Sequence, residues 1–192
     1  WYTLLNLHKH GFNKFIFPLG YKGDMIEKLV TNEFHDYDFE MHFIQTGRDT
    51  PVAKRLKKAI DIIPNKDDFF MLNGDTFFDF DIDEMYRLHK SKGSLLTLSS
   101  VELVSSYGLI VEKNNVLTDF KRGSNIAHVS LDESKNILGY INAGLIWVNK
   151  QALDFVDLDT CENLEKELFP KLIKKNKVSH YKIQGNWFAI DT

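Results

Sequence analysis

Two aspartates in this sequence follow short apolar segments, a position from which a carboxylate can bind a metal ion. Asp75 comes soon after residues 69–72, Phe-Phe-Met-Leu, and Asp191 comes directly after residues 187–190, Trp-Phe-Ala-Ile. Apolar runs of this length indicate buried strands, and open α/β sheets bind ligands at the carboxyl ends of their strands. Carboxylate oxygens are ligands that Mg²⁺ prefers. We therefore predict that parallel alignment of the two strands lets Asp75 and Asp191 share one Mg²⁺.

Both positions also allow simpler interpretations. The Asn-Gly pair before Asp75 is typical of an ordinary turn after a strand, and Asp191 alone is typical of a surface carboxylate near a chain end. Gly74 lets the backbone turn tightly and lets a ligand approach closely. The choice between a turn and a site depends on the rest of the sequence.

The composition favours a single soluble domain with a small-molecule partner. The 192 residues are 43% hydrophobic, which is enough for a full core, and the formal charge of -3 provides no broad basic surface for nucleic acid. The single cysteine, Cys161, excludes an internal disulfide and a cysteine-based zinc cluster, which agrees with a cytoplasmic location. No apolar stretch reaches the ~18 residues that a membrane span needs, so we expect no membrane partner.

Helical and strand patterns alternate along the first hundred residues. Strands are predicted at 15–17, ended by Pro18, and at 39–44, 69–72 and 95–101. Helices are predicted near the start of the chain and at 24–30, 52–63 and 82–90. Repeated β-α-β units imply a parallel sheet with helices on both faces.

The pattern changes after Val101. Residues 107–111 and 116–120 read as the strands of a hairpin, and residues 138–148 as a long strand interrupted by Asn142, Ala143 and Gly144. A helix at 164–174 and strands at 178–183 and 187–190 complete the prediction. The fold class is therefore α/β, with a mixed, mainly parallel sheet flanked by helices. With no repeat or linker, residues 1–192 are interpreted as one domain.

Short motifs follow one another along nearly the whole chain. They lie at residues 10–13, 20–23, 46–50, 55–57, 73–75, 107–108, 141–144, 164–170 and 187–192. In this order they resemble the sugar-phosphate nucleotidyltransferases, most closely the glucose-1-phosphate cytidylyltransferases, with guanylyltransferase-like features at 164–170. The resemblance implies a Rossmann-like fold of the nucleotide-diphospho-sugar transferase type. It also implies Mg²⁺-dependent joining of a nucleoside triphosphate, CTP or GTP, to a sugar 1-phosphate, giving an NDP-sugar and pyrophosphate for surface polysaccharide synthesis.

The same resemblance implies roles for individual residues. The catalytic groups are Asp75, Asp191 and Lys121, of which the two aspartates bind the metal. The residues that bind the sugar are Gly108, Asn142, Gly144 and Glu165. The residues that bind the nucleotide are Thr50, Arg55 and Gly74. Simpler interpretations stay open: a solvated basic turn at Lys121, the polar face of a helix at 54–58, and a first-turn helix charge at Glu165.

The chain departs from the family at three places. Phe120 is followed by Lys-Arg-Gly where the family has Glu-Lys-Pro, so the glutamate that contacts a sugar hydroxyl is absent. Ala53 and Lys54 stand where the cytidylyltransferases have Gly-Gly. The family's N-terminal Gly-rich loop, with its Gly-Thr-Arg and Pro-Lys-Pro elements, is not within these residues. We therefore expect residues upstream of Trp1, without which the chain as given binds triphosphate weakly and lacks transferase activity.

Two other functions stay open. The Asp-x-Asp pattern at residues 79–83 could hold the metal of a glycosyltransferase, although Asp81 and Asp83 also suit the cap and first turn of a helix. The absent Gly-rich loop is also compatible with a catalytically silent sugar-nucleotide-binding subunit. The sequence identifies neither the sugar nor the base, and it leaves assembly as a homo-oligomer open.

Overall fold

The computed structural model describes residues 1–64, 67–101, 108–113, 116–122, 130–131, 137–138 and 140–190, with side chains described for 1–64, 67–101 and 140–190. The helices are α1 (Tyr2–Lys9), α2 (Gly23–Glu33), α3 (Val52–Ala59), η1 (Ile60–Ile62), α4 (Ile82–Ser91), η2 (Lys150–Phe155), α5 (Leu164–Glu167) and α6 (Phe169–Ile173). The strands are β1 (Lys14–Leu19), β2 (Glu40–Gln45), β3 (Asp68–Leu72), β4 (Thr76–Asp79), β5 (Leu96–Val101), β6 (Gly108–Lys113), β7 (Val116–Arg122), β8 (Ser130–Leu131), β9 (Ile137–Leu138), β10 (Ile141–Asn149), β11 (Val178–Lys182) and β12 (Asn186–Ala189). None of the helices in this part of the chain is long and apolar enough to cross a membrane.

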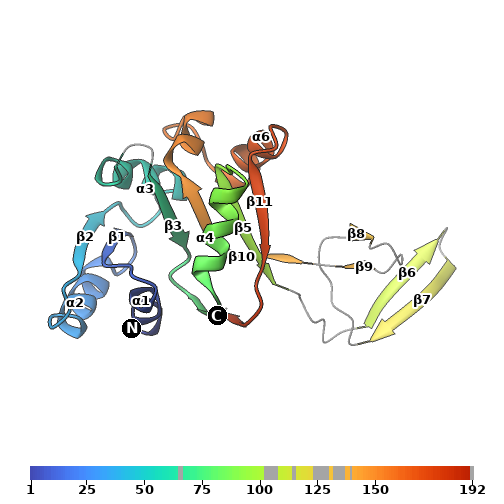
Figure 1. Ribbon diagram of the computed structural model, residues 1–192, viewed down its shortest axis with the longest axis horizontal. Coiled ribbons are helices and arrows are strands. Elements are labelled where there is room, and N and C mark those ends of the chain that lie inside the picture. The colour runs from blue at the N-terminus through green and yellow to red at the C-terminus, as the bar shows by residue number, and fades with distance from the viewer. Residues whose placement is uncertain are drawn as a thin grey trace.

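A four-stranded sheet in the order β11-β5-β10-β3 forms the centre of the structure (Figure 1). Strand β11 runs parallel to β5, whereas β10 runs antiparallel to both β5 and β3. Strands β1 and β2 form a parallel pair, and β4 pairs antiparallel with β12. The predicted hairpin is present as the antiparallel pair β6 and β7. The fold class is thus mixed α/β, as predicted.

The antiparallel β10 is the main departure from the β-α-β winding that the first half of the sequence indicates. Strand β10 follows the β8 and β9 pair in the chain, not a crossover helix. Parallel neighbours need such a crossover, because the chain must return to the starting edge of the sheet. The chain therefore enters β10 from the edge where β5 ends.

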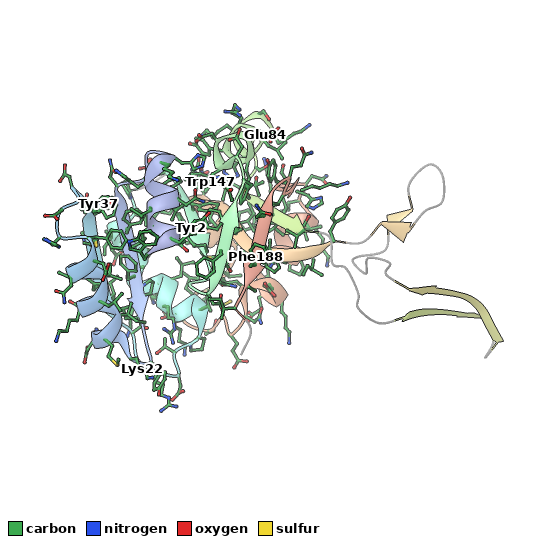
Figure 2. All side chains as sticks on the ribbon, turned by 90° about the horizontal axis from the view of Figure 1, so that it is seen from below. Tyr2, Lys22, Tyr37, Glu84, Trp147 and Phe188 are labelled. Carbon is green, nitrogen blue, oxygen red and sulfur yellow. The ribbon has the colours of Figure 1, made fainter. Side chains whose placement is uncertain are left out.

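Strand β10 is apolar from Leu145 to Val148 because both of its faces are covered there. Leu145 and Trp147 belong to the core on the α4 side, and Ile146 and Val148 belong to the core that α6 covers. Burial on both faces explains a continuous apolar run in place of an alternating one. In Figure 2, Trp147 lies in the interior of the side-chain packing.

A buried carboxylate ties α4 to the start of β3. The Asp68 side chain is 4% exposed and accepts hydrogen bonds from Lys90 Nζ at 2.9 Å, Asn149 Nδ2 at 2.7 Å and Tyr86 Oη at 3.1 Å. His89 Nε2 lies 3.4 Å from Asp68 Oδ1. A buried charge needs this many partners, because burial without them is costly. The network therefore holds the start of β3 against α4, at the opposite end of the strand from the Asp75 turn.

Several predicted elements differ in detail from those observed. Strand β1 continues through Pro18 to Leu19, and within the described chain it pairs on one side only, where a proline is tolerated. The helix predicted at 52–63 ends as the 3₁₀ turn η1, and the helix predicted at 164–174 is divided into α5 and α6 at Leu168. Strand β4 was not predicted.

Candidate active site

A cavity of about 370 Å³ lies where β3, β10 and β12 come together. It is lined by Asn73, Asp75, Thr76, Asn142, Ala143, Gly144, Glu165, Trp187 and Ala189. We call it the Asn142 cavity. Four residues that the sequence singled out, distant from one another along the chain, line it together: Asp75, Asn142, Gly144 and Glu165.

An irregular segment of β10 shapes one wall of this cavity. Asn142 pairs with Ser100 and Ile146 pairs with Leu98, so residues 143–145 lie opposite Ser99 alone. Such an insertion bends a strand and turns its side chains away from the regular pleat. The interruption predicted from the small residues of this segment is therefore present, as a bulge that faces the cavity.

Gly144 is required at the bulge. Its φ of +72° is a backbone conformation that side chains with a Cβ rarely adopt, and a Cβ there would lie 2.8 Å from Asn73 Nδ2. The Gly144 carbonyl also accepts from the Asn73 backbone N–H at 3.3 Å. Glycine therefore allows the turn after β3 and the bulge of β10 to pack in direct contact.

Asn142 and Glu165 form a hydrogen-bonded pair. Asn142 Nδ2 donates to Glu165 Oε1 at 2.9 Å, and Asn142 Oδ1 accepts from the Gly144 N–H at 3.0 Å. Glu165 lies in the first turn of α5, which Asn163 caps by accepting from the Lys166 N–H at 3.0 Å. An amide has two N–H donors and a carboxylate has two acceptor oxygens, so the pair retains capacity to bind hydroxyl groups.

Asp75 lies in the turn between β3 and β4, and the strand that precedes Asp191 lies beside it. The Ile190 N–H donates to the Asp75 carbonyl at 3.0 Å, and Ala189 pairs with Thr76 in the β12–β4 ladder. Asp191 itself lies outside the described residues, so the shared metal site stays a prediction. The two apolar segments do not pair with each other in the described chain: β3 pairs with β10, and β12 pairs antiparallel with β4, the strand that follows Asp75.

Gly74 leaves open space at the same turn. A Cβ at this position would meet no atom within 4 Å, and the backbone is not in the left-handed region. The protein's own packing therefore does not require glycine here. The open space is compatible with the close approach of a ligand that the sequence predicts.

Thr50 and Arg55 lie in a different part of the structure: Thr50 is in the loop before α3, and Arg55 is within α3. Thr50 Oγ1 donates to the Thr46 carbonyl at 2.6 Å. Arg55 donates from Nε to the Thr50 carbonyl at 2.8 Å and from Nη2 to the Arg48 carbonyl at 3.0 Å. Both residues thus hold their own loop together, and neither lines the Asn142 cavity. Their binding of a nucleotide stays a prediction.

Gly108 and Lys121 belong to the β6–β7 ladder. Gly108 pairs with Arg122, and Lys121 pairs with Leu109. Side chains of this segment lie outside those that the structure describes. The predicted contacts of these two residues with the sugar phosphate stay predictions.

The acidic residues at 79–83 include the N-cap of α4, Asp81, and a residue of its first turn, Asp83. Asp81 caps α4 by accepting from the Glu84 N–H at 2.8 Å, and this bond is the main cause that lowers the pKa of Asp81. Asp83 Oδ2 contacts His10 Nδ1 at 3.1 Å. Asp81 and Asp83 therefore fit the cap and first turn, which favours this interpretation over the glycosyltransferase metal site.

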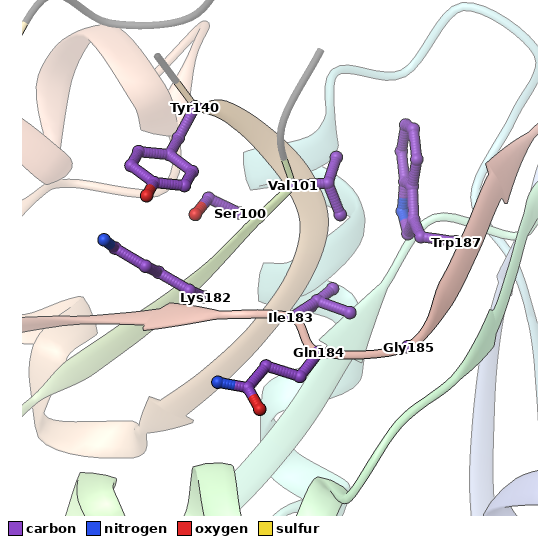
Figure 3. A pocket seen from close by; sticks show the side chains of 8 residues that line it. All are labelled: Ser100, Val101, Tyr140, Lys182, Ile183, Gln184, Gly185 and Trp187. Atoms are coloured by element: carbon purple, nitrogen blue, oxygen red, sulfur yellow. The ribbon is translucent and has the colours of Figure 1, made fainter. Parts of the chain in front are cut away.

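A second cavity, of about 390 Å³, was not predicted from the sequence. It is lined by Ser100, Val101, Tyr140, Lys182, Ile183, Gln184, Gly185 and Trp187. Figure 3 shows Lys182 beside Tyr140 on one side and Trp187 on the other, and Lys182 Nζ lies 4.4 Å from the centroid of the Tyr140 ring. Trp187 lines both cavities.

Comparison with known sequences relates the chain to sugar 1-phosphate enzymes. It is 23% identical to glucose-1-phosphate cytidylyltransferase of Salmonella typhimurium, with 100% of this chain and 78% of the relative covered. It is 26% identical to mannose-1-phosphate guanyltransferase of Gibberella zeae, with 94% of this chain and 48% of the relative covered. The chain thus spans about half the length of that guanyltransferase.

Comparison with solved structures supports the fold. HddC from Yersinia pseudotuberculosis matches with a TM-score of 0.67 at 21% identity, covering 98% of this chain and 78% of that chain. At this identity the match supports the fold. The family model described as nucleotidyl transferase matches residues 1–190, so the chain belongs to the nucleotidyl transferase family, in agreement with the order of its motifs.

Proposed function

We propose that residues 1–192 form part of one catalytic domain of a sugar-1-phosphate nucleotidyltransferase, and that the Asn142 cavity binds the sugar 1-phosphate. The observation that carries this proposal is the convergence of Asp75, Asn142, Gly144 and Glu165 on one cavity. Each of these residues belongs to a motif shared with the family, and they come from three separate segments. Convergence of polar groups in a cavity is typical of a small-molecule site.

The Asn142–Glu165 pair suits a sugar ring. A hydroxyl group both donates and accepts, so it can donate to Glu165 while it accepts from the amide of Asn142. The hydrogen bond between the two side chains, at 2.9 Å, holds them before any ligand arrives. Preorganised polar groups lower the cost of ordering on binding.

The chemistry of Asp75 and its position in the cavity suit the binding of a magnesium ion. Mg²⁺ is usually held by one or two carboxylates together with substrate phosphates and waters, so a cluster of three acidic side chains is not needed. Asp75 lines the cavity, and oxygen is the donor atom that its side chain offers. We propose Asp191 as the second ligand, since Ile190 contacts the Asp75 backbone. When bound, the ion would be held by Asp75 and Asp191 and would supply positive charge that offsets the charge of the phosphates and stabilises the transferred group.

The proposed reaction needs no covalent intermediate with the protein. An oxygen of the sugar phosphate attacks the α-phosphorus of the triphosphate, the bond to the β-phosphate breaks, and pyrophosphate leaves. The nucleophile is already an anion, so the residues of this chain align it and offset the repulsion between phosphates. Asn142 and Glu165 would hold the sugar in place during this step.

CTP and GTP are the proposed nucleotides. The matched relatives include a cytidylyltransferase and guanyltransferases, and HddC from Yersinia pseudotuberculosis has been solved with GMP-PN. We also propose the cytoplasm as the location, because the free, buried Cys161 fits a reducing compartment.

A panel assay on the natural full-length protein tests the proposal. Four nucleoside triphosphates are combined with the 1-phosphates of glucose, mannose and a heptose, and pyrophosphate release is measured. We expect release with CTP or GTP and at least one sugar 1-phosphate, and none when the matching sugar 6-phosphate is supplied instead. No release with any pair contradicts the proposal. Transfer of sugar from an NDP-sugar to an acceptor would support the glycosyltransferase alternative instead.

A further inference from the structure

The side chain of Trp187 contacts the β10 bulge that presents Asn142 to the cavity. Trp187 belongs to the motif at 187–192, but the resemblance to the family gives it no role. Its indole Nε1–H donates to the Ala143 carbonyl at 2.9 Å. We propose that Trp187 is a positioning residue, which fixes the backbone of β10 so that Asn142 and Gly144 can receive the sugar 1-phosphate. This inference rests on the proposed function of the Asn142 cavity.

The bulge explains why a side-chain donor is needed. Residues 143–145 face Ser99 alone, so the regular β5–β10 ladder cannot satisfy their carbonyls. The Leu145 carbonyl accepts from Ser99 Oγ at 2.7 Å, and the Gly144 carbonyl accepts from the Asn73 N–H. The Ala143 carbonyl accepts from Trp187, and Ala143 is only 1% exposed. A buried carbonyl without a partner is costly, so loss of the indole N–H should allow the bulge to rearrange.

Trp187 also connects the two sides of the proposed site. It pairs with Phe78 in the β12–β4 ladder, and three residues later Ile190 donates to the Asp75 carbonyl. The segment from Trp187 to Ile190 therefore contacts the β10 bulge through a side chain and the Asp75 turn through its backbone. A change confined to the indole N–H should disturb the sugar side of the cavity and leave the Asp75 turn in place.

Trp147 provides a matched control within the same strand as the bulge. It is 7% exposed and packs against the Tyr86 ring, with ring centroids 4.4 Å apart. Its indole Nε1 has no hydrogen-bond partner within the described chain. Replacing Trp147 by Phe therefore removes an indole from the core without removing a hydrogen bond.

Steady-state kinetics on the natural full-length protein compare Trp187→Phe with Trp147→Phe. For Trp187→Phe we expect KM for the sugar 1-phosphate to rise about five- to tenfold, the effect of losing one hydrogen bond. We expect kcat and KM for the triphosphate to stay within about twofold. Trp147→Phe should leave all three constants within about twofold. An unchanged sugar KM in Trp187→Phe, or the same rise in both variants, would overturn the inference.

Hydrogen exchange gives a second measurement that does not depend on turnover. The Gly144 N–H donates to Asn142 Oδ1, so its exchange rate reports on the order of the bulge. We expect exchange at Gly144 to be at least about fivefold faster in Trp187→Phe and unchanged in Trp147→Phe; equal rates would refute the positioning role. Failure of every substrate pair to release pyrophosphate would contradict the proposed function, while the exchange rates would still decide the role of Trp187.

Discussion

Asn142 and Glu165 are joined by a hydrogen bond of 2.9 Å between side chains that are 23 residues apart in the sequence. Asn142 belongs to β10, an inner strand of the sheet, and Glu165 belongs to the first turn of α5. Their hydrogen bond makes the two side chains one polar unit, whereas the sequence predicted each only as a separate sugar-binding residue.

Because they form one unit, Asn142→Ala and Glu165→Ala should not have additive effects. We expect each variant to raise KM for the sugar 1-phosphate about tenfold, and the double variant to raise it little further, since either change breaks the same pair. Glu165→Gln, which can still accept from Asn142, should have a smaller effect. A double-mutant cycle on KM checks this, and fully additive effects would show that the two groups act independently.

Asp75→Asn should lower turnover by at least about 100-fold while the fold is retained, because the amide keeps the shape of the side chain but removes its charge. The matched control is Asp79→Asn, at the exposed end of the adjacent strand β4 and outside the cavity lining. Pyrophosphate release and circular dichroism are measured for both. Turnover of Asp75→Asn near that of Asp79→Asn would remove Asp75 from the metal site.

Gly144→Ala should lower the free energy of unfolding by roughly 2–4 kcal/mol, from a left-handed backbone and from contact with Asn73. Gly93→Ala is the control, since Gly93 has a φ of +59° but a Cβ there would meet no atom within 4 Å. We expect Gly93→Ala to cost only about 1 kcal/mol. Urea denaturation of both variants measures the difference, and equal costs would mean that Asn73 moves aside freely.

Asp68→Asn should destabilise the fold in a pH-dependent way. Burial raises the pKa of Asp68, but hydrogen bonds from Lys90 and Asn149 outweigh it, so the pKa lies below its ordinary value of 3.8. A carboxyl whose pKa is lowered by folding stabilises the folded state above the ordinary pKa, and this contribution is lost as the pH falls through the lowered value.

At pH 7 we therefore expect Asp68→Asn to lower the free energy of unfolding by about 1–3 kcal/mol. The difference from wild type should shrink as the pH falls below 3.8. Asp67→Asn, at the exposed neighbouring position, should show little difference at any pH. Denaturation at a series of pH values tests both, and a constant difference for Asp68→Asn would mean that its charge does not stabilise the fold.

The sequence predicted most helices and strands because their apolar residues recur with clear periods. The helix expected at 82–90 is α4, and the strand expected at 95–101 is β5. It also predicted that the strand at 138–148 is interrupted by Asn142, Ala143 and Gly144, because small residues within an apolar strand often mark a bulge or the close approach of a ligand. Periodicity identifies elements but does not determine the partner or direction of a strand, so the sequence predicted a mixed sheet without identifying β10 as its antiparallel strand.

The sequence predicted which residues form the candidate site, but only part of how the structure brings them together. Asp75, Asn142, Gly144 and Glu165 were named from motifs, and the structure brings all four to one cavity. The role of Trp187 at the bulge depends on a contact across 44 residues between two strands, which no local pattern reveals. The same is true of β4, whose pairing with β12 places Ile190 beside Asp75.

The position of β10 between β3 and β5 has a consequence for how the chain folds during synthesis. Both neighbours precede β10 in the sequence, so their inner edges have no partner until β10 has been made. At about 5–20 residues per second, translation from the end of β3 to the end of β10 takes roughly 4–15 s. During that interval β3, and β5 once it has been made, lack the strand that joins them. Their association with chaperones should therefore end only once Asn149 has emerged.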